Sequence, residues 1–216
     1  MSYSKAMNPF HRLQALRMEN DAAAFRQEEM RGRFQAYKTR HEDGTAPRAV
    51  SAFNLFQTPP ELAERLVSML ELHRNKRVLE PSAGLGRLLD AIGRAGAWDV
   101  TAVESAKECA AELYRQERPE LKLLQRDFLT IQPEETGLFD AVAMNPPFHM
   151  RADIRHIMHA RKFLKPGGII AALCMDTHHR EDALRPIAST WEKIPAGAFK
   201  GEGTMIASVL LTIRAA

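Results

Sequence analysis

The amino-acid sequence predicts an α/β fold, in which a doubly wound and mostly parallel sheet is covered by helices on both faces. From about residue 50, short apolar runs of strand length alternate with longer amphipathic segments of helical spacing. A glycine-rich turn follows the first apolar run, between Glu80 and Leu88, as at the first βα junction of such sheets. Right-handed crossovers then make consecutive strands parallel and place helices on either side.

The first half of this region alternates regularly. A helix with prolines at its first turn is expected in TPPELAERLVSMLEL, from residue 58 onward. Strands are predicted at 77–80, 99–104 and 121–125, separated by helices at about 86–95 and 106–116. The strands are short and largely apolar, which fits burial on both faces of the sheet.

The second half begins after a loop that holds Pro133 and Gly137. A strand at 139–144 ends in the turn NPPF, and a helix at about 153–163 ends at a Lys-Pro-Gly-Gly turn before the apolar run 169–175. The last elements predicted are a polar helix around 181–191, a strand near 192–194 and a final strand at 205–213.

Composition narrows the functional classes. The 216 residues are 45% hydrophobic and 26% charged, which is ordinary for a globular protein with a full-sized core. No apolar run approaches the roughly 20 residues of a membrane span, and the first residues lack the apolar segment of a secretory signal, so we expect a cytoplasmic protein. The two cysteines, Cys109 and Cys174, exclude a disulfide framework and are expected to be small core residues.

The positive charge is concentrated at the N-terminus. The formal net charge is +3, and residues 1–48 hold nine basic and six acidic side chains, so the remainder is balanced with 21 of each. We predict an N-terminal helical extension, residues 1–50, followed by a catalytic-size domain, residues 51–216. Arginines interleaved with aromatic residues in the extension fit a clamp on phosphate groups, or equally an amphipathic surface that packs on the domain or on a second subunit as a homodimer.

The glycine turn VLEPSAGLGRLL predicts a ligand site at the end of the first strand. Gly84 and Gly86 allow the backbone to approach a ligand closely and to adopt positive φ. Leu89 stands where a dinucleotide fingerprint has a small residue, and Glu80 lies directly at the strand end. A carboxylate there disfavours a pyrophosphate and favours a ligand with a positive group, such as the amino or sulfonium group of S-adenosylmethionine.

Acidic residues also follow the next two strands. Glu104 is placed to accept hydrogen bonds from ribose hydroxyls, and Asp127 from an adenine amino group, with the ring of Phe128 packed on the base. The alternative for each acid is a solvated strand end. Three acids at three successive strand ends favour a nucleoside-containing ligand.

The turn after the strand at 139–144 predicts the site of chemistry. Pro146 and Pro147 cannot donate backbone hydrogen bonds, so carbonyl groups are presented there as acceptors in a rigid frame. The side-chain oxygen of Asn145 is a further acceptor, and Phe148 is placed to stack on a ring that carries an amino group. The pattern is typical of a site that aims an amino nitrogen at a methyl donor, for which positioning supplies most of the catalysis.

Together these motifs resemble class I S-adenosylmethionine-dependent methyltransferases, and among them the small phage and prophage enzymes related to adenine-N6 DNA methyltransferases. The resemblance covers about residues 55–213. It implies a seven-stranded sheet in the order 3-2-1-4-5-7-6 with the seventh strand antiparallel, and residues 192–213 suit the closing hairpin. It also implies S-adenosyl-L-methionine as the cofactor and a nucleic acid, with DNA favoured, as the partner. We expect no metal, because methyl transfer needs none, and no membrane, because the chain lacks a long apolar run.

The resemblance assigns roles residue by residue. AMNPPF resembles a motif of Asp, Asn or Ser, two prolines and an aromatic residue, which assigns catalysis to Asn145, Pro146, Pro147 and Phe148 and substrate contact to Phe148 and His149. The segment around Thr58 resembles one that helps to bind the methionine carboxylate. The full set of cofactor-binding residues implied is Thr58, Glu80, Pro81, Ala83, Gly84, Gly86, Glu104, Ser105, Asp127, Phe128 and Asn145.

Other acceptors stay open. Sequence-specific DNA methyltransferases usually carry a long target-recognition region, whereas only residues 1–50 lie outside the predicted domain. The motif NPPFH, with His149, also resembles ribosomal guanine-N2 methyltransferases, and related motifs ending in tyrosine methylate glutamine in release factors. A methyltransferase-fold module that binds nucleic acid or a protein without catalysis is the non-enzymatic alternative.

Overall fold

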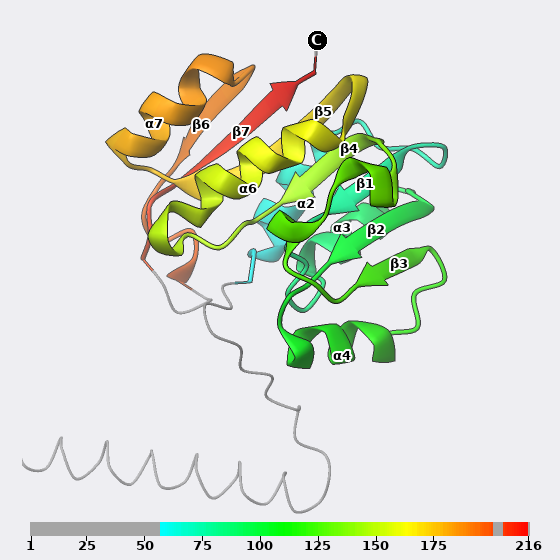
Figure 1. The fold of residues 1–216 in the computed structure, drawn as a ribbon. Coiled ribbons are helices and arrows are strands. Elements are labelled where there is room, and N and C mark those ends of the chain that lie inside the picture. The colour runs from blue at the N-terminus through cyan, green and yellow to red at the C-terminus, as the bar shows by residue number, and fades with distance from the viewer. Residues whose placement is uncertain (1–56, 201–204, 216) are drawn as a thin grey trace, which may run out of the picture. The chain divides into compact units, whose positions relative to one another are not determined.

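A computed structural model describes residues 57–200 and 205–215 of the chain (Figure 1). The predicted N-terminal helical extension lies outside the described residues. The described residues form a seven-stranded sheet in the order β3-β2-β1-β4-β5-β7-β6. Its strands are β1 (Arg77–Glu80), β2 (Asp99–Val103), β3 (Leu121–Leu124), β4 (Phe139–Met144), β5 (Leu164–Met175), β6 (Thr190–Ile194) and β7 (Ser208–Arg214).

The predicted fold class and strand order are confirmed. The first five strands pair in parallel, and β7 pairs antiparallel with both β5 and β6. The helices are α2 (Pro60–Ser68), α3 (Arg87–Arg94), α4 (Lys107–Arg115), α5 (Pro133–Thr136), α6 (Ala152–Ala160) and α7 (His178–Leu184), with short 3-10 turns η1 (Phe128–Thr130), η2 (His149–Arg151), η3 (Arg161–Phe163) and η4 (Arg185–Ile187).

Two apolar cores lie on the two faces of the sheet, because successive strand residues point to opposite sides. In β5, Ile169, Ala171 and Leu173 join one core, and the intervening Ile170 and Ala172 join the other. Helices α2, α3 and α4 contribute to the first core, whereas η1, α6 and α7 contribute to the second (Figure 1). Both faces are therefore covered, as a doubly wound sheet requires.

Several predicted boundaries differ from the structure. The expected helix at 181–191 is instead α7, and Trp191 lies in β6. Pro186 has no backbone N–H and limits the helix on its C-terminal side. The expected loop after β3 contains the short elements η1 and α5. They were not predicted because the proline and glycine of this segment indicated a loop.

Strand β5 is longer than the predicted run 169–175. It starts at Leu164, which pairs with Phe139, and it resumes at Ile169, which pairs with Ala141. The intervening Pro-Gly-Gly residues form an irregularity in which Gly167 has φ 73°. Proline and glycine signalled a turn in the sequence, but the sheet accommodates them as a bulge.

The sheet order creates the position of a ligand site. Strands β1 and β4 are neighbours, with Val78 opposite Ala141 and Leu79 opposite Val142, while the chain winds outward from them in opposite directions. Ligands bind at this kind of switch point, outside the carboxyl ends of the strands, because the two crossover connections separate there. Glu80 ends β1 and Asn145 follows β4, so the pairing brings the two predicted motifs together.

Both cysteines lie in the interior, as expected, at 1% exposure for Cys109 and 0% for Cys174. Burial is the main cause that raises the pKa of the Cys109 thiol to about 11 and that of the Cys174 thiol to about 12. Across the described ranges, no helix is long and apolar enough to cross a bilayer.

Candidate active site

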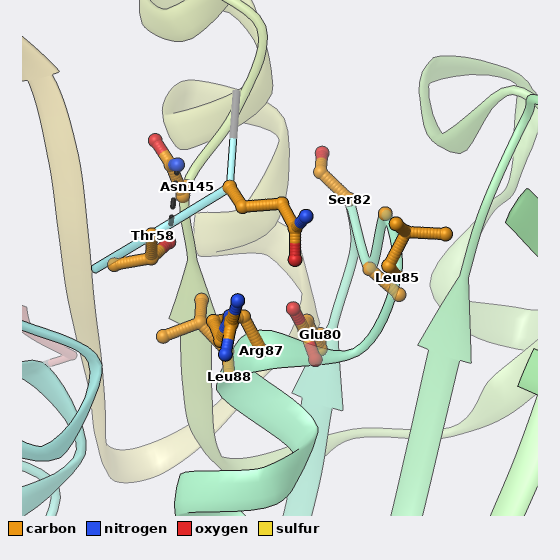
Figure 2. A pocket seen from close by; sticks show the side chains of 10 residues that line it. Thr58, Glu80, Ser82, Leu85, Arg87, Leu88 and Asn145 are labelled. Carbon is orange, nitrogen blue, oxygen red and sulfur yellow. Dashed lines mark hydrogen bonds between the residues drawn. The ribbon is translucent and has the colours of Figure 1, made fainter. Parts of the chain in front are cut away.

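A pocket of about 280 Å³, which includes space open to solvent, lies at the carboxyl ends of β1 and β4 (Figure 2). It brings together residues from the segment before α2, from the glycine turn and from the NPPF turn. The residues that line it are Gln57, Thr58, Glu80, Ser82, Ala83, Gly84, Leu85, Arg87, Leu88 and Asn145.

The glycine turn reaches the pocket through a backbone that most residues cannot adopt. Gly84 and Gly86 have φ angles of 54° and 90°, in the left-handed region. The amide of Gly86 donates to the carbonyl of Ala83 at 2.8 Å, and the amide of Ala83 donates to the carbonyl of Val103 at 3.1 Å. A Cβ atom at Gly86 would lie 2.9 Å from Cδ2 of Leu113. Both conformation and space therefore require glycine at position 86.

Glu80 places a buried carboxylate in the wall of the pocket. The residue is 1% exposed, and among the described residues no hydrogen-bond partner meets its Oε2 atom. Burial is the largest cause that raises the pKa of Glu80 well above its ordinary value; the carboxylates of Glu104 and Asp90 raise it further, and the Arg118 guanidinium opposes them. A cationic ligand group here would stabilise the ionised carboxylate.

Glu104 holds the glycine turn against the end of β2. One carboxylate oxygen accepts from the backbone N–H of Gly84 at 2.6 Å, and the other accepts from the N–H of Ala106 at 2.6 Å. The side chain is 8% exposed. A carboxylate has about four acceptor positions, so these two bonds leave acceptor capacity on each oxygen. Ser105, the next residue, is exposed, and Pro81 is buried behind the turn.

Asp127 and Phe128 lie after β3, as predicted, but their side chains differ in accessibility. Asp127 caps η1 by accepting from the N–H of Leu129 at 2.9 Å. Phe128 is 2% exposed; it packs edge-on against His159, at 4.9 Å between ring centroids, and at a tilt against Phe163, at 5.2 Å. The ring of Phe128 therefore belongs to the core in this structure.

The histidines of α6 belong to the same aromatic cluster. His159 is bonded through Nε2 to the carbonyl oxygen of Ile131 at 2.9 Å, and His156 approaches Ser82 at 3.4 Å. Burial is the largest cause that lowers the pKa of His156 to about 4. Throughout residues 57–200 and 205–215, no group of three or more His, Cys, Asp or Glu side chains is arranged to hold a metal ion.

Asn145 occupies the edge of the pocket directly after β4. Its Nδ2 atom donates to the hydroxyl of Thr58 at 3.1 Å, and Thr58 is 3% exposed (Figure 2). This bond determines which way the amide faces, with nitrogen toward Thr58 and oxygen on the other side. Pro146 is buried next to Asn145, and Pro147 is partly buried.

The chain after the prolines turns sharply outward. Phe148 is partly buried, whereas His149 and Met150 are exposed. Met150 and Arg151 adopt left-handed φ angles of 48° and 58°. Left-handed backbone is uncommon outside glycine and costs roughly 1–3 kcal/mol per residue. Such strain clusters at functional sites, and here it follows immediately on the predicted catalytic motif.

The pocket also contains residues that sequence reasoning missed: Gln57, Ser82, Leu85, Arg87 and Leu88. Arg87 is the most informative of them. Its Nε atom is buried, and within the described part of the chain no hydrogen-bond partner meets it. Arg87 begins α3, directly after the second glycine, and a cation at that position of a ligand turn was the signal available in the sequence.

The donor set of the pocket fits the methionine end of S-adenosylmethionine. A buried acid, Glu80, suits an ammonium or sulfonium group, and a buried guanidinium nitrogen, on Arg87, suits a carboxylate. The left-handed glycines leave room at the turn for close approach of a ligand. The fit depends on both charges, since an acid alone would suit any cation.

The sheet order and the ligand site at its switch point define the S-adenosylmethionine-dependent methyltransferase fold, which is Rossmann-like. The chain belongs to the Methyltransferase small domain family, whose family model matches residues 61–198. No curated protein sequence matches the chain.

Solved structures share this fold at low sequence identity. PH1948 of Pyrococcus horikoshii, a candidate RNA methyltransferase, is 18% identical with a TM-score of 0.62, over 74% of this chain and 84% of that one. A modification subunit of a candidate type I restriction enzyme from Vibrio vulnificus YJ016 is 15% identical with a TM-score of 0.61, over 87% and 49%. The tRNA m1G37 methyltransferase of M. jannaschii is 15% identical with a TM-score of 0.57, over 77% and 53%. The chain thus spans about half the length of the last two proteins.

Proposed function

We propose that this protein transfers a methyl group from S-adenosylmethionine to an exocyclic amino group, with adenine N6 in DNA as the leading acceptor. The observation that carries the proposal is the pocket at the β1–β4 switch point, where the buried acid Glu80 and the acceptor Asn145 line one cavity. The Methyltransferase small domain family supports the same class of reaction.

Different residues around the cavity are proposed to bind different parts of the cofactor. Glu80 faces the positive groups of the methionine end, and Thr58 and Arg87 supply donors to its carboxylate. Glu104 and Ser105 receive the ribose, since both follow β2, which pairs directly with β1. The cofactor supplies a methyl group that a sulfonium makes electrophilic.

Asn145 and the two prolines orient the acceptor. The nitrogen of the Asn145 amide is bound to Thr58, and its oxygen, which is buried in the ligand-free structure, is the proposed acceptor for one hydrogen of the amino group. The adjacent carbonyl groups are the proposed acceptors for the second hydrogen. The amino nitrogen is then held with its lone pair directed at the methyl carbon. Transfer would form the new C–N bond as the C–S bond of the sulfonium breaks, which would leave a neutral thioether, and the amino proton would leave to solvent.

Positioning carries most of this reaction. An oriented donor and acceptor can gain several kcal/mol over the reaction in solution, roughly 7–11 in favourable cases. Phe148 stacks on the acceptor ring and fixes its plane. Phe148 and His149 are the proposed substrate contacts, and Asp127, which is exposed after β3, is the proposed acceptor for the adenine amino group of the cofactor.

A nucleic-acid acceptor is favoured by the kinds of proteins that share the fold, which include RNA methyltransferases and a restriction-modification subunit. A second acceptor, guanine N2 of ribosomal RNA, is favoured by His149, which follows NPPF and is exposed. A protein glutamine is the third acceptor that the motif allows. The basic N-terminal extension is the proposed contact to phosphate groups.

The test is identification of the methylated product. The protein is incubated with methyl-labelled S-adenosylmethionine and, separately, with unmethylated DNA, ribosomal RNA and a release factor, and each product is digested to nucleosides or amino acids. We expect label in N6-methyladenine from DNA and none with Asn145→Ala. Label in guanine or glutamine would show that the acceptor is that group and not adenine. Transfer by Asn145→Ala would overturn the catalytic assignment.

A measurement of cofactor binding distinguishes the proposed enzyme from the non-catalytic alternative. Calorimetry with S-adenosylmethionine should give saturable binding that Asn145→Ala retains and Glu104→Ala loses. A protein that binds DNA but no cofactor would instead be a methyltransferase-fold binding module.

A further inference from the structure

A buried ion pair lies behind the NPPF turn, and the proposed reaction does not use it directly. Asp153 in α6 is 0% exposed, and Arg180 in α7 is 7% exposed. The guanidinium contacts the carboxylate through two nitrogens, Nε to Oδ2 at 3.0 Å and an Nη atom to Oδ1 at 3.1 Å. This bidentate geometry is the strongest form of the pair.

The same guanidinium also holds the catalytic turn. The Nη2 atom of Arg180 that contacts Asp153 also donates to the carbonyl oxygen of Phe148 at 3.1 Å. Asp153 in turn accepts from the backbone N–H of Met175, the last residue of β5, at 3.2 Å. The pair therefore joins the end of β5, the start of α6, α7 and the residue that stacks on the acceptor.

The segment that follows Phe148 requires such an anchor. Met150 and Arg151 hold left-handed φ angles of 48° and 58°, which non-glycine residues keep only when surrounding contacts enforce them. Arg155 donates to the carbonyl of Met150 at 3.3 Å, but it is exposed. The Arg180 contact is made by a buried side chain, so its loss would allow the turn to relax and carry Phe148 with it.

We infer that Arg180, held by Asp153, is a positioning residue for methyl transfer: it fixes the Phe148 peptide so that the ring meets the acceptor at the correct angle. The inference rests on the proposed function. It assigns Arg180 no contact with cofactor or substrate, because its contacts are the Phe148 carbonyl, Asp153 and Thr177.

The test uses Arg180→Lys in the full chain. Lysine keeps the charge that pairs with Asp153 but has a single nitrogen, so it cannot form the planar fork that spans Asp153 and Phe148. We expect kcat for methyl transfer to fall by roughly 10- to 100-fold, as for a misplaced reacting group, with the Kd for S-adenosylmethionine within about twofold of wild type. Arg94→Lys, in an exposed pair with Glu64, is the matched control and should leave both values unchanged.

A double-mutant cycle separates positioning from general stability. If Arg180 acts through Phe148, then Arg180→Lys should cost much less in a Phe148→Leu background than in wild type. Equal losses in both backgrounds would overturn the inference. Wild-type kcat in a folded Arg180→Lys protein would do the same.

Two further measurements keep the inference testable if a variant unfolds or if no acceptor is methylated. The double variant Asp153→Leu with Arg180→Met removes both charges together, which is commonly tolerated, and it should fold with the same loss of kcat.

Independently of activity, 4-fluorophenylalanine at position 148 should give one narrow ¹⁹F signal that shifts or broadens in Arg180→Lys. An unchanged ¹⁹F signal would overturn the positioning role. Absence of methyl transfer by the wild type, with a changed ¹⁹F signal, would overturn the proposed function alone.

Discussion

The amide of Asn145 donates to the hydroxyl of Thr58 at 3.1 Å, although the two residues are 87 positions apart in the chain. Thr58 precedes α2, and Asn145 follows β4 in the middle of the sheet. The bond connects the proposed acceptor site to the segment proposed to hold the methionine carboxylate. The two proposed parts of the site, for the methyl donor and for the methyl acceptor, therefore share one hydrogen-bonded contact.

Thr58→Val should lower methyl transfer by about tenfold, since a hydrogen bond of about 1–1.5 kcal/mol orients the Asn145 amide. Valine has nearly the shape of threonine and lacks the oxygen. Thr58→Ser is the control, because it keeps the hydroxyl, and it should retain most of the activity in a labelled-methyl assay. Equal activity in the valine and serine variants would show that the bond does not orient Asn145.

Glu80→Gln should stabilise the ligand-free protein relative to wild type as pH rises above the ordinary pKa of glutamate. The pKa of Glu80 is raised in the folded protein, mainly by burial, so the folded state holds this proton more tightly than the unfolded chain does. The stability that results is greatest below the ordinary pKa of 4.5 and declines as pH rises through the raised pKa. Glutamine carries no titrating proton, so the stability of the variant relative to wild type should increase by at least about 1 kcal/mol as pH rises from pH 5 to pH 8.

Urea denaturation of both proteins across this pH range provides the measurement. The same variant should bind S-adenosylmethionine at least about tenfold more weakly, because a neutral amide replaces a charge-assisted contact to the cationic end. A constant difference in unfolding free energy at all pH values would contradict the raised pKa.

Gly86→Ala should destabilise the protein more than Gly96→Ala. Both glycines have left-handed φ angles, 90° and 85°, so alanine costs about 1–2 kcal/mol of backbone strain at either position. At Gly96 a Cβ atom would meet nothing within 4 Å, whereas at Gly86 it would lie 2.9 Å from the buried Leu113. The overlap should add about 1–3 kcal/mol. Thermal unfolding of the two variants isolates this packing cost, and equal losses would show that Leu113 yields.

Glu104→Gln should lower stability by about 2 kcal/mol and loosen the glycine turn. The carboxylate accepts from two backbone amides, of Gly84 and Ala106, and a glutamine side chain has only one accepting oxygen, so one amide N–H loses its partner. Glu108→Gln, at an exposed position of α4, is the control and should change stability little. Amide hydrogen exchange at Gly84 should be faster in Glu104→Gln only.

The fold could be predicted because its signals are local. Apolar runs and turn residues identified β1 and β4 with the boundaries the structure shows, and the alternation with helices predicted the parallel sheet. The errors fall where tertiary contacts override local signals. Pro166 and its glycines indicated a turn, but they lie within β5 as an irregularity between Leu164 and Ile169, which both pair with β4.

The candidate site was predicted in part for the same reason. Glu80 and Asn145 each lie at a strand end that the sequence marks, so parallel pairing was enough to bring them together. Arg87 was missed because an arginine at the start of a helix is ordinary in sequence. Its position directly after the glycine turn was a weak signal, and the burial of its Nε atom in the pocket distinguishes it from other arginines at helix starts.

The sequence by itself determined the class of fold, the order of its elements and the two turns that form the pocket, because each depends on residues within one short segment. The tertiary structure alone decided what those residues contact. In the folded chain Glu104 accepts a hydrogen bond from the glycine turn, Phe128 is buried in the core, and Arg180 donates to the carbonyl of Phe148. Such contacts join segments distant in the chain, and the physical reason they escape the sequence is that side-chain burial and hydrogen-bond geometry exist only after the sheet has assembled.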